Sequence, residues 1–213
     1  FSEAYEELQT LSKAQPDNVQ IFIRMANIAF MMENYGAMAT ACEKAILLDS
    51  ENATAHYLYA EACKGQGDDV NTIAMATKAI SIDNKQGNAY LLRGETYLRT
   101  QQLSEAEADA DWLLEHTEDN EDVLLLKARI ERAANHNNEA IEYFTKAIDA
   151  NPFSYTAFKE RSEMYSLIGN EVKAKEDAER AEELMPTDGK ENAEENIEKQ
   201  LNDKYKQMNP YGF

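Results

Sequence analysis

The sequence repeats itself with a 34-residue period, which constrains the fold more than any other feature of the chain. Pro16, Pro152 and Pro186, three of its four prolines, all fall at the same place in this period. Windows of this length then keep one register without insertion or deletion: 19–52, 53–86, 87–120, 121–154 and 155–188. We therefore expect five complete repeats, preceded in residues 1–18 by the second helix of a truncated repeat.

Equivalent positions of the five windows carry side chains of similar size. Position 8 of each window is always small: Ala26, Ala60, Gly94, Ala128 and Ser162. Position 4 is bulky: Phe22, His56, Tyr90, Leu124 and Phe158. Small against large side chains at spacings of three or four residues indicates two amphipathic helices packed antiparallel. Turn residues such as Gly169-Asn170 separate the two helices, and breaks such as Asn151-Pro152 close the windows.

Residues 189–208 depart from the repeat but keep a single apolar stripe. Ala193, Ile197, Leu201 and Tyr205 follow one another at four-residue spacing, and the other faces are charged or amide. One apolar side on a terminal helix is typical of the cap of a repeat array. We expect a capping helix over 189–208 and a frayed tail at 209–213.

The repeat resembles the tetratricopeptide repeat, whose 34-residue pattern combines W-x-x-L-G-x-x-Y, A-x-x-x-F and a terminal proline. The matching residues are Tyr90, Gly94, Tyr97 and Ala106 in window 87–120; Ala128, Ala140, Phe144, Ala147 and Pro152 in window 121–154; and Phe158, Tyr165, Ala174, Ala181 and Pro186 in window 155–188. The resemblance implies an all-α fold: a right-handed α-solenoid of antiparallel helix hairpins with a C-terminal capping helix. It implies no single function, because one fold hosts many sites.

The charge of the chain excludes some partners. The net charge is −19 at pH 7, which repels nucleic acid and anionic membrane surfaces. The most apolar run, 21–32, is broken by Arg24 and Asn27, so we expect no membrane insertion. The chain begins with Phe1 in the middle of a repeat, so the absence of a signal peptide leaves both a cytoplasmic and a cell-envelope location open.

Nothing in the sequence indicates catalysis, a cofactor or a metal. His56, His116 and His136 fall in a packing position, at a helix end and in a turn, and no Ser or Cys partner surrounds them. Carboxylates are frequent between 105 and 122, but the first of them alternate with alanines along a helix and fan out, unlike a calcium loop. We expect a solvated outer face there, and a chain that is not an enzyme.

The two cysteines are 21 residues apart and form no C-x-x-C motif. Cys42 and Cys63 both occupy core positions, so we expect buried thiols. The sequence leaves open whether they pair across the seam between repeats.

The resemblance also implies a binding groove. In the family the first helices line a concave surface, and positions 2, 5, 6, 9, 12 and 13 point into it. The groove residues that we predict from this are Phe30, Tyr57, Leu91, Leu125, Arg99, Arg129, Arg132 and Lys159. Family members that hold acidic chaperone tails use a two-carboxylate clamp, of which only Asn27 is present here, so we reject that ligand.

Alternatives stay open for this groove. The leucines could instead pack against the neighbouring first helix, and the cations could be neutralised by Glu95, Glu131, Glu160 and Glu163. If the cations are accessible, four positive charges in so acidic a chain would suit an acidic peptide or a carboxylate terminus.

We therefore expect a non-catalytic scaffold that binds an unidentified protein or peptide in the groove. One alternative is an architectural repeat segment of a larger protein. Another is a module for a small ligand or glycan, with Phe30 and Tyr57 as stacking platforms. Residues 2–14 carry an apolar face formed by Ala4, Leu8 and Leu11, which has no first helix to cover it, so self-association through this helix is a further expectation.

Overall fold

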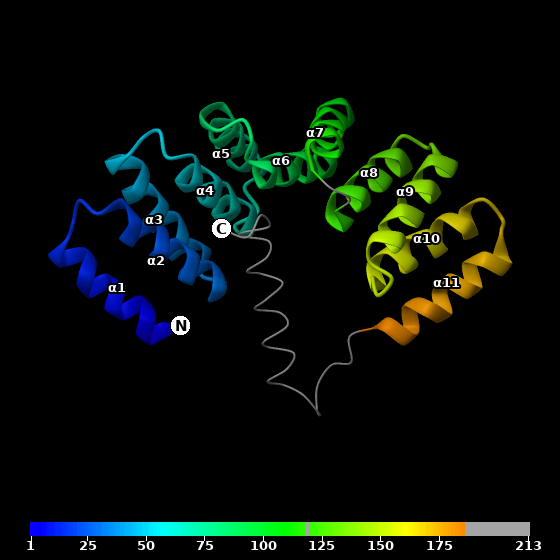
Figure 1. The fold of residues 1–213 in the computed structure, drawn as a ribbon, viewed down its shortest axis with the longest axis horizontal. Coiled ribbons are helices and arrows are strands. Elements are labelled where there is room, and N and C mark those ends of the chain that lie inside the picture. The colour runs from blue at the N-terminus through cyan, green and yellow to red at the C-terminus, as the bar shows by residue number, and fades with distance from the viewer. Residues whose placement is uncertain (118–119, 186–213) are drawn as a thin grey trace. The chain divides into compact units, whose positions relative to one another are not determined.

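The computed structural model describes residues 1–117 and 120–185, and within them the chain forms eleven α-helices and no strand (Figure 1). The helices are α1 (Ser2–Ala14), α2 (Val19–Met31), α3 (Tyr35–Leu48), α4 (Ala53–Gly65), α5 (Asp69–Ile82), α6 (Gly87–Arg99), α7 (Leu103–His116), α8 (Glu121–Ala133), α9 (Asn137–Ala150), α10 (Tyr155–Leu167) and α11 (Glu171–Leu184). The predicted all-α fold of helix hairpins is confirmed. The capping helix predicted at 189–208 and the tail at 209–213 lie outside the described residues, and the handedness of the superhelix stays a prediction.

The helices start with the period of the sequence. The first helix of each hairpin begins at Val19, Ala53, Gly87, Glu121 or Tyr155, and the second at Tyr35, Asp69, Leu103, Asn137 or Glu171, so that each series follows the 34-residue spacing. We number repeat positions from 1 at residues 19, 53, 87, 121 and 155.

Side-chain caps mark these starts. The side chains of Asn18, Asn52, Asn120 and Ser154 accept a backbone N–H bond at the start of α2, α4, α8 and α10. Asn34, Asp68 and Asn170 do the same for the second helices α3, α5 and α11. A short polar side chain in this place satisfies an N–H group that the helix itself leaves without an acceptor.

The turn inside each hairpin has one backbone conformation. Glu33, Gly67, Gln101, Asn135 and Gly169 all occupy position 15, and all have a positive φ, between 55° and 77°. Glycine adopts this left-handed conformation without cost, whereas a residue with a Cβ does so under strain. The same turn is therefore built five times, with an optimal residue in only two of them.

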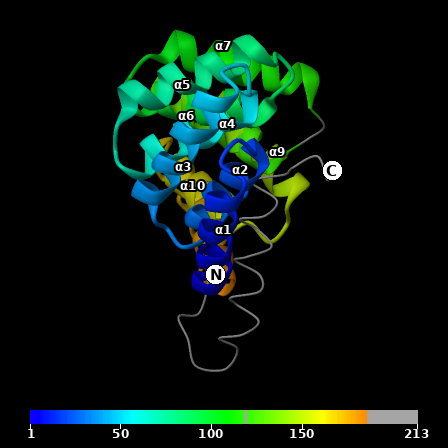
Figure 2. The same cartoon turned by 90° about the vertical axis from the view of Figure 1, so that its left-hand side faces the viewer.

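The described residues fall into two compact units, 1–96 and 97–185, with the boundary inside α6. In unit 1, α1 packs on α2, α2 on α3, α3 on α4 and α4 on α5, and α2 also meets α4 (Figures 1 and 2). Its core contains Ala26 and Ala60 of position 8, which are fully buried between the helices. Gly65 ends α4 against the ring of Tyr35, where any Cβ would clash with that ring.

Unit 2 pairs α8 with α9 and α10 with α11, and α7 and α9 pack against the first helix that follows each of them. Its core includes Leu124, Ala128, Phe144 and Met164, all with no more than 2% of their surface exposed. The small residue at position 8 of α8, Ala128, is again fully buried. Each unit thus has its own apolar core.

Cys42 and Cys63 are both buried free thiols. They lie on α3 and α4, which pack against each other in unit 1. Burial raises the pKa of the Cys42 thiol to about 12, and the nearby Cys63 and Glu43 contribute to this rise. At neutral pH Cys42 is therefore protonated and a poor nucleophile or metal ligand.

Candidate binding surface on the first helices

Successive first helices in unit 2 are joined by ion pairs in a fixed register. Arg129 at position 9 of α8 bonds through Nε and Nη2 to Glu160 at position 6 of α10, 31 residues later, with Nε–Oε1 at 2.9 Å. Arg132 at position 12 lies 3.2 Å from the same carboxylate and 3.6 Å from that of Glu163 at position 9. We call Arg129, Arg132, Glu160 and Glu163 the first-helix face of unit 2. Its two guanidinium groups are balanced by two carboxylates.

Unit 1 uses the same register with other charges. Lys64 at position 12 of α4 lies 2.8 Å from Glu95 at position 9 of α6, again 31 residues later. Glu61 at position 9 of α4 accepts a hydrogen bond of 2.8 Å from the hydroxyl of Tyr57. We call Glu61, Lys64 and Glu95 the first-helix face of unit 1. It carries two carboxylates and one ammonium group.

A second recurring contact joins four of the five described first helices, α4, α6, α8 and α10, to the second helix before each of them. The side chain at position 7 bonds to a side chain 16 residues earlier, at distances of 2.8–3.0 Å: Tyr59 to Glu43, Arg93 to Thr77, Lys127 to Asp111 and Arg161 to Thr145. The contact needs a donor at position 7 and an oxygen opposite it, and four different pairs of residues meet this need. In these four helices position 7 therefore forms a structural polar seam.

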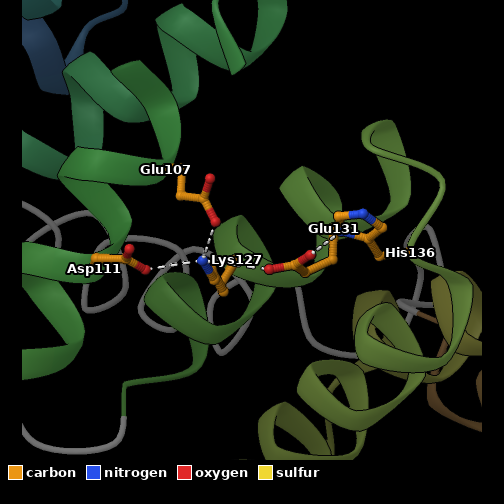
Figure 3. A network of polar contacts seen from close by, with 5 residues as sticks. All are labelled: Glu107, Asp111, Lys127, Glu131 and His136. Carbon is orange, nitrogen blue, oxygen red and sulfur yellow. Dashed lines mark hydrogen bonds and ion pairs between the residues drawn. The ribbon is translucent and has the colours of Figure 1, made fainter. Parts of the chain in front are cut away.

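The most buried member of this seam is Lys127 of α8 (Figure 3). Its ammonium nitrogen lies 2.8 Å from Asp111, 2.9 Å from Glu107 and 3.3 Å from Glu131, and Glu131 in turn lies 2.9 Å from Nδ1 of His136. Burial lowers the pKa of Lys127, but its bonds to Asp111 and Glu107 outweigh this and hold the pKa above its ordinary value. Sequence reasoning missed this cluster, although a cation at position 7 with a carboxylate 16 residues earlier marks it.

The residues predicted to line the groove differ in accessibility. Tyr57 and Leu125 are buried, each with 5% of its surface exposed, and Leu125 belongs to the core of unit 2. Phe30, Leu91, Arg129 and Arg132 are half-buried, and Arg99 and Lys159 are exposed. The ammonium group of Lys159 lies 5.7 Å from the centre of the Tyr155 ring.

These positions decide between several of the alternatives raised by the sequence. Arg129 and Arg132 are paired with Glu160 and Glu163, as the neutralisation alternative expects. Glu95 and Glu131 bond instead to Lys64 and Lys127. Tyr57 cannot offer a ring face to a sugar because the ring is buried, which removes one of the two aromatic platforms on which the glycan alternative depends.

The histidines have structural partners. Nε2 of His56 lies 3.0 Å from the carbonyl oxygen of Ser50, His116 stacks on Trp112, and His136 contacts Glu131. At the next position 4 the hydroxyl of Tyr90 donates in the same way to the carbonyl of Asn84, again six residues earlier. His56 therefore anchors the loop between repeats.

The described part of the chain contains neither a candidate metal site nor a candidate membrane-spanning helix. No group of three or more His, Cys, Asp or Glu side chains is arranged to hold a metal ion there. None of the helices described has the length and apolar character needed to cross a membrane.

One repeat of the chain is similar to a known protein family. Residues 121–154 match the family model of the tetratricopeptide repeat. The resemblance to the tetratricopeptide repeat superfamily is confirmed. No curated protein sequence matches the chain. Folds of tetratricopeptide repeats serve in general as non-catalytic scaffolds for protein interaction.

Many solved structures share this fold, among them YrrB, PilW and a protein from Parabacteroides merdae. YrrB, described as a TPR protein with an unusual peptide-binding site, is 19% identical over 86% of this chain and 95% of its own, with a TM-score of 0.67. PilW, a type IV pilus biogenesis factor, is 17% identical over 92% of this chain and 90% of its own, with a TM-score of 0.77. A tetratricopeptide repeat protein from Parabacteroides merdae is 17% identical over 98% of this chain and 86% of its own, with a TM-score of 0.73. At such identities the likeness concerns the fold.

Proposed function

We propose that the chain is a non-catalytic scaffold that binds a protein or peptide on its first helices. The observation that supports this most is the fixed register of charged side chains along these helices. Lys64, Glu95, Arg129 and Arg132 each keep between 30% and 41% of their side-chain surface exposed while ion pairs hold them in place. Side chains that are both ordered and accessible lose little freedom when a ligand binds. The peptide-binding site described for YrrB lies on the same fold.

The scaffold would consist of five repeats, 19–52, 53–86, 87–120, 121–154 and 155–188, after the second helix of a truncated repeat in 1–18. The helix starts at 34-residue intervals support this division. The proposed binding residues are Phe30 and Leu91 in unit 1 and Arg99, Arg129, Arg132 and Lys159 in unit 2, whereas Tyr57 and Leu125 would support them from the cores.

An acidic ligand has one specific requirement at this surface. The guanidinium of Arg129 already bonds to both oxygens of Glu160, so an incoming carboxylate must displace that side chain or bind beside it. Such competition weakens binding, because the internal carboxylate is always present at high local concentration. Arg99 and Lys159 are the predicted cations that remain exposed.

The test is a binding screen of short acidic, basic and apolar peptides against the full chain at two salt concentrations. An acidic ligand should lose affinity in an Arg129→Ala, Arg132→Ala double variant and gain affinity in Glu160→Gln. The control is Lys44→Ala, because Lys44 is an exposed cation on the second helix α3. Binding that ignores both salt and these substitutions would favour the half-buried apolar residues Phe30 and Leu91. If no peptide binds, the scaffold proposal fails and the architectural alternative stands.

A further inference from the structure

We infer that Glu61 on α4 accepts a basic side chain, lysine or arginine, from a protein partner. This rests on the proposed use of the first helices for binding and names the chemistry of one contact in unit 1. The two first-helix faces have the same register and different charges.

One of the two contacts between successive first helices has the same charges in both units. A cation at position 12 meets a carboxylate at position 9 of the next first helix: Lys64 with Glu95 in unit 1, and Arg132 with Glu163 in unit 2. This pair accounts for equal and opposite charges in each case.

The other contact, between position 9 and position 6 of the next first helix, differs between the units. In unit 2, Arg129 at position 9 meets Glu160 at position 6 of the next first helix. In unit 1, position 9 is Glu61, and the equivalent residue of the next first helix is Leu92, an apolar side chain with 2% of its surface exposed. The charge of Glu61 therefore has no counterpart where the charge of Arg129 has one.

The surroundings of Glu61 stabilise the negative charge of its carboxylate only in part. The side chain is half-buried, and its Oε1 accepts the Tyr57 hydroxyl at 2.8 Å. Lys64 is within electrostatic reach, but its ammonium lies 2.8 Å from Glu95. Burial raises the pKa of Glu61 above its ordinary value, the charge of Glu95 adds to this, and Lys64 and Tyr57 only partly oppose it. The ionised form of Glu61 is thus incompletely compensated within the chain.

A basic side chain from a partner supplies the missing charge. Placed beside Glu61, it would take the role that Arg129 and Glu160 fill for each other in unit 2, and it would form a charge-assisted hydrogen bond in a half-buried setting. The chain as a whole carries a net charge of −19, which attracts a basic partner and speeds its encounter. Tyr57 is buried and its hydroxyl holds Oε1 of Glu61 in place, so a ligand would meet a carboxylate that is already ordered.

The experiment uses the full chain and a set of fluorescent peptides that differ at a single residue, which is lysine, acetyl-lysine, norleucine or glutamate. We expect the lysine peptide to bind the wild type about tenfold more tightly than the acetyl-lysine and norleucine peptides. Glu61→Gln, which keeps the shape of the side chain, should remove this preference. The control Glu6→Gln, an exposed carboxylate on α1, should keep it.

A second variant acts without changing Glu61. Glu95→Gln takes away the carboxylate that holds Lys64, so Lys64 becomes available to Glu61 and should reduce the lysine preference as well. Equal binding of all four peptides, or a preference that survives Glu61→Gln, overturns this inference and leaves the scaffold function intact. Failure of every peptide to bind overturns both.

Discussion

Arg129 on α8 and Glu160 on α10 form a two-point ion pair across successive repeats, with Nε at 2.9 Å and Nη2 at 2.5 Å from Oε1. Arg132 places a second guanidinium 3.2 Å from the same carboxylate, of which the side chain is only 13% exposed. One glutamate therefore receives two arginines. Its loss would remove a partner of both arginines, whereas Arg132 would keep Glu163.

We predict that Glu160→Gln lowers the free energy of unfolding by about 1–3 kcal/mol, because it removes the charge from a half-buried network. Glu163→Gln is the matched control, since Glu163 is 56% exposed and an exposed pair is worth about 0–1 kcal/mol. A double-mutant cycle with Arg129→Gln, read from denaturant midpoints, should give a coupling energy of about 1 kcal/mol. Equal midpoints for the two glutamate variants would contradict the central role of Glu160.

Lys127 gives a prediction on buried charge. Lys127→Met would leave Glu107, Asp111 and Glu131 facing one another without a cation, and we expect a loss of about 1–3 kcal/mol, less than for a fully buried pair because Glu107 and Asp111 are half in solvent. Lys127→Arg should retain most of the stability.

The raised pKa of Lys127 also predicts how the stability of the fold depends on pH. Its pKa in the fold lies above the ordinary value of 10.5, so its contribution is complete below pH 10.5 and is lost as the pH rises through the folded value. The difference between wild type and Lys127→Met in thermal unfolding should therefore be constant from pH 7 to pH 9 and shrink above pH 10.5. A difference that vanishes already at pH 8 would show that the bonds to Asp111 and Glu107 do not form.

The left-handed residue at position 15 offers a stabilising substitution. Gln101 has φ of 62° and is exposed, so Gln101→Gly should raise the free energy of unfolding by about 0.5–1 kcal/mol through relief of backbone strain. Gly67→Gln is the reverse change, and nothing lies within 4 Å of an added Cβ there. It should therefore cost about 1–2 kcal/mol from the backbone alone. If both substitutions shift the urea midpoint in the same direction, the turns are not equivalent.

The raised pKa of Glu61 predicts that its ionised side chain lowers the free energy of unfolding at neutral pH. Burial raises its pKa above the ordinary value of 4.5, so its favourable contribution is complete below pH 4.5 and is lost as the pH rises through the folded value. At pH 7 the ionised side chain is a cost, and Glu61→Gln should be at least as stable as the wild type. Thermal unfolding should show this advantage shrinking as the pH falls toward 4.5, whereas Glu6→Gln should show no such trend. An advantage that grows with acid would mean that Lys64 compensates Glu61 fully.

The sequence predicts most of the architecture because the repeat is a property of residue size and spacing. Small side chains at position 8 and polar caps before seven of the described helices recur with the period, and the first and second helices start at these intervals in the structure. The all-helical hairpin fold follows from side-chain volume and helix periodicity alone. The capping helix predicted at 189–208 stays a prediction.

The candidate surface is harder to predict from the sequence than the fold. Position 5 is predicted to face the groove, and there Tyr57 and Leu125 are buried, Leu91 is half-buried and Lys159 is exposed. Accessibility at one repeat position therefore differs from repeat to repeat, which the period alone does not predict. The ion pairs at 31-residue separation depend on the stagger between successive first helices, which no local pattern encodes. The contrast between Glu61 with Leu92 and Arg129 with Glu160 becomes visible only once that stagger is known.

The last prediction concerns the apolar face of α1. Leu11 occupies position 27 of the truncated repeat and is 39% exposed, whereas Leu113 at position 27 of its own repeat is 1% exposed. Among the described residues no first helix precedes α1. Leu113→Ala should therefore cost about 2–5 kcal/mol, and Leu11→Ala well under about 1 kcal/mol in the monomer.

The same exposure underlies the proposed self-association through 2–14. If two copies cover each other's α1, the sedimentation coefficient should fall on dilution, and Leu11→Glu should abolish this dependence while Leu47→Glu, at an exposed leucine of α3, preserves it. Hydrogen exchange then provides an independent measure, because an uncovered terminal helix opens far more often than a packed one. A monomer at all concentrations with strong amide protection over 2–14 would show that α1 is stable on α2 alone and needs no second copy.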